Sequence, residues 1–503
     1  MKTEKSDNLE KKIKKNIYGK PQSVKVVFPP GLGSVALHEV ETILEDLWFK
    51  QKYISQCSLL KNEIRIDNIH LFAITELLMR SQCLTDIRLI IFKGKTAGKS
   101  IFEKKSREMN WDFYLNKNMS VKIKVDSVAS RAFHETGLKE ILSDVVKEYV
   151  SDIVSGEDAH ETTVIYADLY KDKLTMSISL AGNQLYKRGY RGTLSASAPL
   201  REDAAACCIQ QSLQFVKRSA AYLSPCGRGR RAAAGEGCYA EVPFISHQGR
   251  HENTLTNPQG EKEKLIYATT PRSDTQFVVD TVLIPFSGTG TFLFEYLQMA
   301  FRFSPALIGR DYALQKMPLF RQENFNFLLK KAKECCLFPP ALFSTNRPTF
   351  FCIDNSKTAN AALLDNIQFF KNAVSEQGFD FPAQLFIEND QPVHEDDFFK
   401  LDLLKWMNAH NQPRGNVFIP LNPPYGIRLG KNKDSVALYK NIAMKLNEIA
   451  RLIQKEQKNV LGFILCPSEE TWSAFCKVLI CSETETYHFT QGGIDIRVCQ
   501  FIM

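Results

Sequence analysis

The chain lacks any apolar stretch near the roughly 20 residues that a membrane-spanning helix requires, which argues against an integral helical membrane protein. No Cys-x-x-Cys pair occurs among its 13 cysteines, which argues against a zinc site or a disulfide framework and favours reduced cytoplasmic thiols. The lysine-rich N-terminus contains no apolar core and no arginine, so it fits neither a secretory signal nor a transit peptide. We therefore expect a cytoplasmic protein with no metal site and no membrane partner.

The composition is that of a large globular protein with a surplus of basic residues. A hydrophobic content of 44% with 24% charged residues is ordinary for such proteins. The length of 503 residues is too great for one hydrophobic core and predicts about three domains. The net charge of +8 favours a polyanionic partner, although many basic proteins bind no nucleic acid and the charge alone is weak evidence.

The first part of the chain reads as a tail followed by alternating strands and helices. Residues 1–22 carry many lysines and predict a basic, disordered tail. Short alternating runs and helical patterns then continue to about residue 190 and predict an α+β region. Residues 217–275 include the aperiodic run Cys226–Gly235 and predict a flexible basic insertion. An inert loop and an RNA-contacting segment are equally good interpretations of that insertion.

From about residue 276 the pattern becomes strand, turn and helix in repetition. Alternating units of this kind predict a parallel sheet covered by helices, with ligands bound at the carboxyl ends of the strands. The predicted strands are Val278–Ile284, Phe350–Asp354, Val417–Leu421 and Val460–Leu465.

The most informative segment is Asn422-Pro423-Pro424-Tyr425, which follows the third of these strands. The amino nitrogen of a conjugated ring is a poor nucleophile because its lone pair is delocalised. The side-chain carbonyl of Asn422 and the backbone carbonyl of Pro423 can each accept one N–H and localise that lone pair. Pro424 stiffens the turn, and Tyr425 offers a face for stacking. A plain proline turn after a strand is the alternative.

A glycine-rich turn follows the first of these strands and runs from Pro285 to Thr291. Glycines let the backbone approach a ligand, and the N-terminus of the next helix suits a carboxylate. Asp354 follows the second strand and suits a ribose, with a helix N-cap as an equally easy interpretation. Asp397 suits an adenine amino group, with an exposed acidic turn as the alternative.

The order of these segments resembles that of class I S-adenosylmethionine-dependent methyltransferases that act on amino groups of nucleic acid bases. Leu185–Arg191, Ala198–Glu202 and Asn422–Gly430 are similar to signatures of THUMP-domain RNA methyltransferases of the RlmL type. That family installs N2-methylguanosine in bacterial 23S ribosomal RNA. Trp111–His134 resembles the THUMP fold, an RNA-binding module, and Phe489–Ile494 resembles the family's closing hairpin.

The resemblance implies an α/β fold with a Rossmann-like class I methyltransferase domain and an N-terminal α+β region. It implies a ferredoxin-like subdomain at 23–69, a THUMP RNA-binding domain at 70–190 and a methyltransferase domain at 191–503. The implied cofactor is S-adenosylmethionine. The implied partner is large-subunit ribosomal RNA or a pre-ribosomal particle.

The resemblance also implies a role for each site residue. Asn422 and Pro423 would hold the target amino group, with Pro424 in the same loop and Tyr425 stacking on the flipped base. Arg188, Arg191 and Arg201 would either contact RNA or rigidify the domain junction, and the sequence does not choose. The implied cofactor-binding residues are Pro285, Ser287, Gly288, Gly290, Thr291, Asp354 for the ribose and Asp397 for the adenine.

One departure from the family pattern keeps other functions open. The family usually has an acid before the proline of the glycine turn, and Ile284 occupies that place here. An adenine-N6 methyltransferase acting on DNA or RNA would use the same Asn-Pro-Pro-Tyr. A non-catalytic RNA-binding ribosome-assembly factor with a degenerate cofactor site is the third interpretation.

Overall fold

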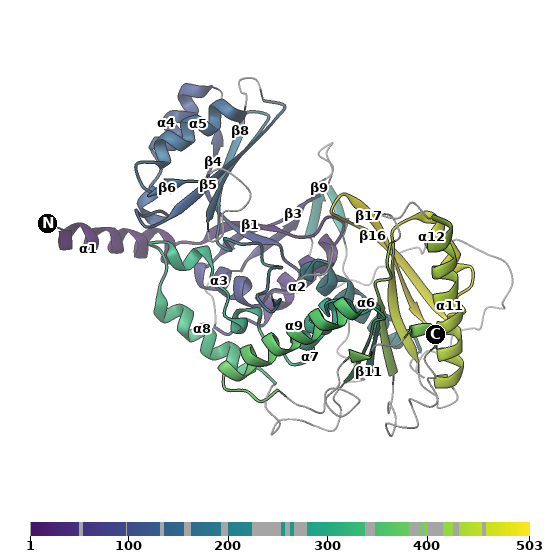
Figure 1. Ribbon diagram of the computed structural model, residues 1–503. Helices are drawn as coiled ribbons and strands as arrows, with labels where there is room; N and C mark the ends of the chain where they lie inside the picture. Colours follow the sequence, from purple (N-terminus) through teal and green to yellow (C-terminus); the bar gives the residue numbers. More distant parts are fainter. Residues whose placement is uncertain are drawn as a thin grey trace.

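The structure is a computed structural model of the chain, and its described residues form two large β-sheets and one two-stranded sheet (Figure 1). No helix among the residues that it describes is both long enough and apolar enough to cross a membrane. The described residues are 2–49, 54–96, 98–130, 135–154, 162–192, 200–223, 253–256, 262–265, 279–337, 348–381, 393–394, 397–400, 416–425, 432–454 and 459–503.

The first sheet has eight strands in the order β2-β3-β1-β4-β8-β7-β5-β6. Alternate residues of its strands are fully buried, as Val24 and Val26 of β1 and Met176 and Ile178 of β8 show. Its elements are β1 (Gln22–Val27), α2 (Gly33–Glu45), β2 (Gln56–Leu59), β3 (Glu63–Ile69), α3 (Leu71–Arg80), β4 (Asp86–Lys95), α4 (Lys99–Arg107), η2 (Trp111–Phe113), β5 (Ser120–Val128), α5 (Glu135–Val146), β6 (Asp152–Ile153), β7 (Thr163–Tyr170) and β8 (Lys173–Ser179).

The ferredoxin-like unit is longer than the sequence predicted. Strands β1 to β4 with helices α2 and α3 form a β-α-β-β-α-β arrangement, and β4 pairs antiparallel with β1. The predicted boundary at residue 69 is therefore wrong, because it separates α3 and β4 from the unit they complete. Strand β4 also pairs with β8, so the two predicted N-terminal domains share one continuous sheet.

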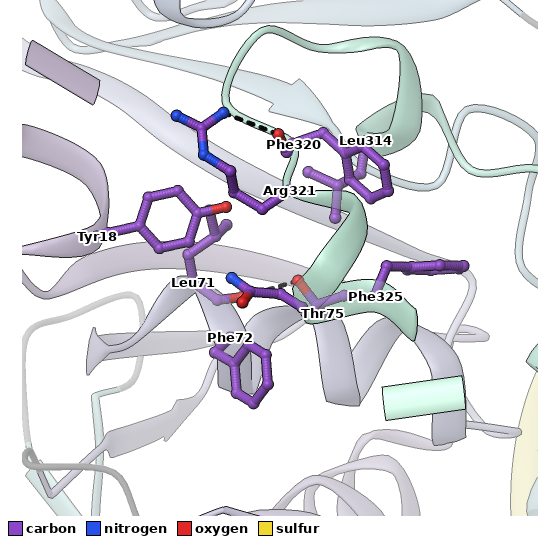
Figure 2. A pocket seen from close by; sticks show the side chains of 9 residues that line it. Tyr18, Leu71, Phe72, Thr75, Leu314, Phe320, Arg321 and Phe325 are labelled. Atoms are coloured by element: carbon purple, nitrogen blue, oxygen red, sulfur yellow. Dashed lines mark hydrogen bonds between the residues drawn. The ribbon is translucent and has the colours of Figure 1, made fainter. Parts of the chain in front are cut away.

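The prediction of a disordered tail over residues 1–22 is also wrong. Helix α1 (Lys2–Ile13) continues into a π-helical turn, η1 (Lys14–Tyr18), and β1 begins at Gln22. Ile13 and Ile17 are each 2% exposed because they pack into the core, and this burial fixes a segment whose lysines suggested disorder. Figure 2 shows Tyr18 facing the small pocket beside α3, where its hydroxyl donates to the carbonyl of Leu319 over 2.8 Å.

The second sheet has seven strands in the order β13-β12-β11-β14-β15-β17-β16. The neighbouring pairs from β13 to β15 are parallel, and β17 is antiparallel to both of its neighbours. This is the doubly wound arrangement that the strand–helix repetition predicted, with a closing hairpin. Its strands are β11 (Val279–Pro285), β12 (Thr349–Ile353), β13 (Val393–His394), β14 (Asn416–Leu421), β15 (Val460–Cys466), β16 (Glu483–Gln491) and β17 (Ile494–Ile502).

Helices cover both faces of this sheet, because consecutive strand residues point to opposite sides. Ile284 of β11 belongs to the core with α6, α7 and α9, whereas Leu283 belongs to the core with α11 and α12 (Figure 1). The helical elements are α6 (Glu202–Leu223), α7 (Thr291–Ala300), η3 (Pro305–Ile308), η4 (Ala313–Lys316), α8 (Gln322–Cys335), α9 (Lys357–Glu376), η7 (Phe398–Lys400), α11 (Asn432–Gln454) and α12 (Glu469–Cys476).

The first residues of the predicted insertion over 217–275 are helical rather than irregular. Helix α6 runs to Leu223, and Arg218 forms an ion pair with Glu485 over 2.8 Å. Strands β9 (Asn253–Thr256) and β10 (Lys262–Leu265) pair antiparallel within the same region. The rest of the predicted insertion lies outside the described residues.

A buried ion pair joins the two halves of the molecule. Arg188, which follows β8, is 1% exposed, and Glu295 on α7 is 0% exposed. Their closest atoms, Nη2 and Oε2, lie 3.3 Å apart, and Arg188 also donates to the carbonyls of Leu185 and Gln82. The amide of Gln82 and the hydroxyl of Tyr190 each donate to Glu295 over 3.2 Å. Every oxygen of this buried carboxylate therefore has a donor.

We predict that Arg188→Met destabilises the fold by about 3–5 kcal/mol above pH 7, where Glu295 is ionised in the wild type, because the buried carboxylate would lose its cation. Adding Glu295→Gln should recover part of that loss, since no charge would then be buried. Chemical unfolding measures both effects. Arg107→Met, which removes an exposed arginine of α4, is the matched control and should leave stability nearly unchanged. Equal losses of stability for Arg188→Met and Arg107→Met would contradict the assigned role of the buried pair.

We also predict a pH dependence from Glu295. Burial raises its pKa from 4.5 to about 7, although Arg188 opposes the shift. The folded state therefore favours the protonated acid. This contribution to stability is complete below about pH 4.5 and is lost as the pH rises through 7, by up to about 3 kcal/mol. Glu295→Gln should remove that loss, so parallel pH profiles for the wild type and the variant would contradict the prediction.

Candidate active site

The segments singled out in the sequence come together at one edge of the second sheet. Pro285 at the end of β11 pairs with Ile353 at the end of β12, and β14 pairs with β11 on its other side. Because these strands are parallel, the residues that follow them emerge at the same edge. The strand order reverses around β11, and such a switch point opens a crevice between the loops that follow the strands.

The glycine turn is held in a conformation that requires its glycines. Gly288 and Gly290 have φ values of 55° and 86°, in the left-handed region. The Gly290 N–H donates to the carbonyl of Ser287 over 2.9 Å, and the Ser287 N–H donates to Ile353 over 3.0 Å. Within the described part of the chain, the buried hydroxyl of Ser287 has no hydrogen-bond partner. The turn therefore presents a free polar atom at the start of α7.

Asp354 lies directly beside this turn. Its Oδ2 accepts from the Gly288 N–H, and its Oδ1 accepts from the Ser356 N–H, each over 2.9 Å. The N-cap of α9 is Ser356, whose hydroxyl accepts from the Ala359 N–H over 3.3 Å. The alternative interpretation of Asp354 as the helix N-cap is therefore wrong. Its carboxylate instead ties the end of β12 to the glycine turn.

Asp397 lies near the glycine turn, because the two phenylalanines that follow it pack against Phe286 of that turn. Its Oδ1 accepts from the Phe399 N–H over 3.1 Å at the start of η7. The ring centroids of Phe398 and Phe399 lie 5.8 Å and 6.3 Å from that of Phe286, the residue before Ser287. The structure thus brings the neighbours of this acid against the glycine turn, although only residues 393–394 and 397–400 are described in this part of the chain.

The Asn-Pro-Pro-Tyr segment begins where β14 ends at Leu421. The side-chain oxygen of Asn422 is buried and has no hydrogen-bond partner among the described residues. Pro423 is buried, Pro424 is exposed, and Tyr425 packs half-buried against the core, which raises the pKa of its hydroxyl. A buried oxygen without a donor is costly, and such an atom in a folded protein requires an explanation. Gly426–Gly430 lie outside the described residues.

Sequence reasoning missed the residue that supports the glycine turn from behind. The buried amide of Asn366, on α9, accepts from the Gly192 N–H over 2.6 Å and donates to the Thr289 carbonyl over 2.9 Å. An asparagine in the middle of a helical pattern carries no local signal of such a role. Only the packing of α9 against the turn reveals it.

The three arginines proposed for RNA binding have structural partners. RNA contact is wrong for Arg188, because its guanidinium is enclosed by protein acceptors. Arg191 pairs with Glu202 over 2.6 Å and also donates to the hydroxyls of Thr289 and Thr291 in the glycine turn. Arg201 pairs with Asp203 over 2.5 Å and stacks on Tyr186. The structure therefore favours the rigid junction, which was the alternative interpretation.

The described residues contain no group of three or more His, Cys, Asp or Glu side chains arranged to hold a metal ion. The polar groups at the strand edge are instead the hydroxyl of Ser287, the side-chain oxygen of Asn422, the carboxylates of Asp354 and Asp397, and the N-terminus of α7. These groups suit a polar organic ligand with amino and hydroxyl groups.

The fold is that of the Rossmann-like methyltransferases, as comparison with solved structures shows. A possible methylase from Clostridium difficile aligns with a TM-score of 0.62 at 16% identity, over 96% of this chain and 98% of the other. The putative methyltransferase SMU.472, complexed with SAH, aligns with a TM-score of 0.62 at 15% identity over the same shares. A predicted N6-adenine-specific DNA methylase from Listeria monocytogenes gives 0.60 at 14% identity, over 96% of both chains.

Comparison of sequences identifies two relatives whose function is named more specifically. The chain is 27% identical over 129 residues to the ribosomal RNA large subunit methyltransferase K/L of Saccharophagus degradans. The aligned region covers 24% of this chain and 17% of that protein. It is 22% identical over 158 residues to the protein of the same name from Hydrogenovibrio crunogenus, which covers 30% and 21%. The match thus spans about a fifth of the length of these relatives. No protein-family model matches the chain.

We predict that Gly290→Ala destabilises the protein more than Gly288→Ala, by about 1–3 kcal/mol. Both positions carry the cost of a left-handed backbone. A Cβ at Gly290 would also lie 2.3 Å from Cδ1 of Leu363, whereas no described atom lies within 4 Å of a Cβ at Gly288. Thermal or chemical unfolding of the two variants measures the difference. A larger loss for Gly288→Ala would contradict this account of the turn.

Proposed function

We propose that the protein is an S-adenosylmethionine-dependent methyltransferase that modifies the exocyclic N2 amino group of a guanine in large-subunit ribosomal RNA. The observation that carries the proposal is the buried side-chain oxygen of Asn422 at the end of β14, which has no partner in the part of the chain that the structure describes. That atom accepts an N–H from a planar amino group, and the backbone carbonyl of Pro423 accepts the second. Two acceptors localise the nitrogen lone pair and aim it in one direction, which is the positioning that methyl transfer requires.

The residues of the neighbouring strand ends fit the cofactor. The free hydroxyl of Ser287 and the N-terminus of α7 suit its amino acid part, and the open space above Gly288 leaves room for it. Asp354 retains unused acceptor capacity for ribose hydroxyls, and Asp397 lies beside the aromatic pair that flanks the turn. When bound, S-adenosylmethionine supplies an electrophilic methyl group on its sulfonium sulfur.

Two findings support ribosomal RNA as the substrate, whereas the choice of guanine rests on the resemblance of the sequence to the RlmL-type family. The sequence relatives carry the name ribosomal RNA large subunit methyltransferase K/L. Strands β4 to β8 of the N-terminal sheet fall within residues 70–190, the range for which the sequence resemblance implies an RNA-binding domain. Ile284, which replaces the family's usual acid, is fully buried in the core, and the Asp354 carboxylate contacts the turn in its vicinity. The substitution is therefore compatible with an intact cofactor site.

A second candidate is an adenine-N6 methyltransferase. The same acceptors fit the N6 amino group of adenine, and the structurally similar Listeria monocytogenes protein is described as a predicted N6-adenine-specific DNA methylase. The motif itself does not distinguish the two bases. The identity of the methylated nucleoside does.

We predict that Asn422→Ala lowers methyl transfer at least about 100-fold while leaving S-adenosylhomocysteine affinity within about threefold, because Asn422 contacts only the base. The assay follows labelled methyl transfer to RNA from cells that lack the protein, with nucleoside analysis, and calorimetry measures the affinity. Asn372→Ala, on the exposed face of α9, is the matched control and should retain full activity.

The assay separates the candidates. Label in N2-methylguanosine of large-subunit ribosomal RNA supports the proposal, and label in N6-methyladenine overturns the substrate but keeps the chemistry. An active Asn422→Ala variant would overturn the role of the motif. If the wild type neither binds S-adenosylhomocysteine nor transfers label, the protein is an RNA-binding assembly factor rather than an enzyme.

A further inference from the structure

The N-terminal helix carries a cluster of lysines on one face. Lys11, Lys12, Lys14 and Lys15 are all exposed, whereas Ile13 and Ile17 on the other side are buried in the core. Positions one turn apart on a helix share a face, so the four ammonium groups point away from the body of the protein. We call these four residues the lysine face. They lie within about 6 Å along the helix axis.

The lysine face is presented by a fixed scaffold. The Tyr18 hydroxyl donates to the Leu319 carbonyl over 2.8 Å, and Arg321 lies 5.7 Å from the centre of the Tyr18 ring (Figure 2). The side-chain amide of Gln22 donates to the carbonyls of Asn16 and Ile17 in the π-helical turn and to that of Lys20 just after it. These contacts hold the lysines in place without using their charges.

The four lysines differ from the other clustered lysines of the surface. No acidic side chain of the described residues forms an ion pair with any of the four. On α4, by contrast, Lys104 and Lys105 both pair with Glu108, and on α8, Lys330 and Lys331 both pair with Glu334. Asp7 and Glu10 lie one turn before Lys11 and Lys14, but Glu10 pairs with Arg321 over 3.6 Å, so the cluster keeps a surplus of positive charge. That surplus costs free energy through mutual repulsion, and a polyanion removes the cost.

The lysine face also lies where the two halves of the molecule meet. Helix α1 contacts η2 of the N-terminal half, and Tyr18 is bonded to the segment before α8. Two further exposed lysines, Lys117 and Lys316, lie near this junction. They are close together because the side-chain amide of Asn116 donates to the backbone carbonyl of Lys316 over 2.7 Å. Figure 1 shows α1 pointing outward from this junction, so a long ligand can reach it.

We propose that the lysine face binds the phosphate backbone of the RNA substrate, a deepening that rests on the proposed function. A row of ammonium groups on a rigid helix matches a chain of phosphates. A membrane surface fits less well, because the apolar side of the helix is already buried in the protein and has nothing to insert into a bilayer. The contact gives affinity and orientation without reading sequence.

The test is the quadruple variant Lys11→Gln, Lys12→Gln, Lys14→Gln, Lys15→Gln, with transcribed large-subunit ribosomal RNA as the probe. If all four lysines neutralise phosphates, the slope of log affinity against log salt should fall by about 3–4. Affinity at moderate salt should drop at least about 10-fold. The matched control, Lys104→Gln, Lys105→Gln, Lys330→Gln, Lys331→Gln, removes the same charge from lysines that already have acidic partners. Its slope should change by less than about 1.

The outcomes distinguish this proposal from the proposed function. An unchanged slope in the quadruple variant, or an equal fall in the control, overturns the lysine face. Binding of the wild type to anionic vesicles but not to RNA also overturns it. Retained S-adenosylhomocysteine affinity and an unchanged thermal midpoint exclude misfolding as the cause of a loss. If the wild type binds RNA through the lysine face yet transfers no methyl group, the surface stands and the proposed activity fails.

Discussion

The rest of the structure depends on the buried pair of Arg188 and Glu295. Glu295 sits on α7, the helix that starts at the glycine turn, and Arg188 comes from the segment that leaves the N-terminal sheet. A charge pair removed from water is stable only when every donor and acceptor is satisfied, so its geometry tolerates little displacement. The pair therefore fixes the N-terminal sheet relative to the helix that shapes the ligand edge.

The same constraint extends outward to the site. Arg191 pairs with Glu202 and reaches the hydroxyls of the glycine turn, while Asn366 holds the carbonyl of Thr289. Among the described residues, the hydroxyl of Ser287 and the side-chain oxygen of Asn422 are buried at the ligand edge without a hydrogen-bond partner. Other buried polar atoms of the described residues also lack a partner, but these two lie where the strands end, so a ligand bound at that edge would complete them. Rigid support and free acceptors together make a preorganised site.

Much of the fold and of the candidate site could be predicted, because their signals are local. The strand–helix repetition predicted β11, β12, β14 and β15 to within one residue at each end but gave no sign of the short strand β13. The predicted strand ends placed Asp354, Ser287 and Asn422 on one edge. The errors have one cause. Lysine content suggested a disordered tail, but Ile13 and Ile17 bury against residues far along the chain. Local patterns placed a domain boundary at residue 69, but β4 pairs with β1 on one side and with β8 on the other. The sheet is therefore continuous across the predicted boundary.

The sequence by itself determined the architecture and the chemistry on offer: a doubly wound sheet, a glycine turn and an amide followed by two prolines. These follow from backbone conformation and side-chain type, which neighbouring residues decide. Only the tertiary structure decided which polar groups are satisfied. It enclosed Arg188 and assigned the N-cap of α9 to Ser356 rather than Asp354. It left the oxygen of Asn422 without a donor among the described residues and docked the N-terminal helix with its lysines outward. Burial and pairing depend on partners that are distant in sequence, and desolvation makes their consequences large.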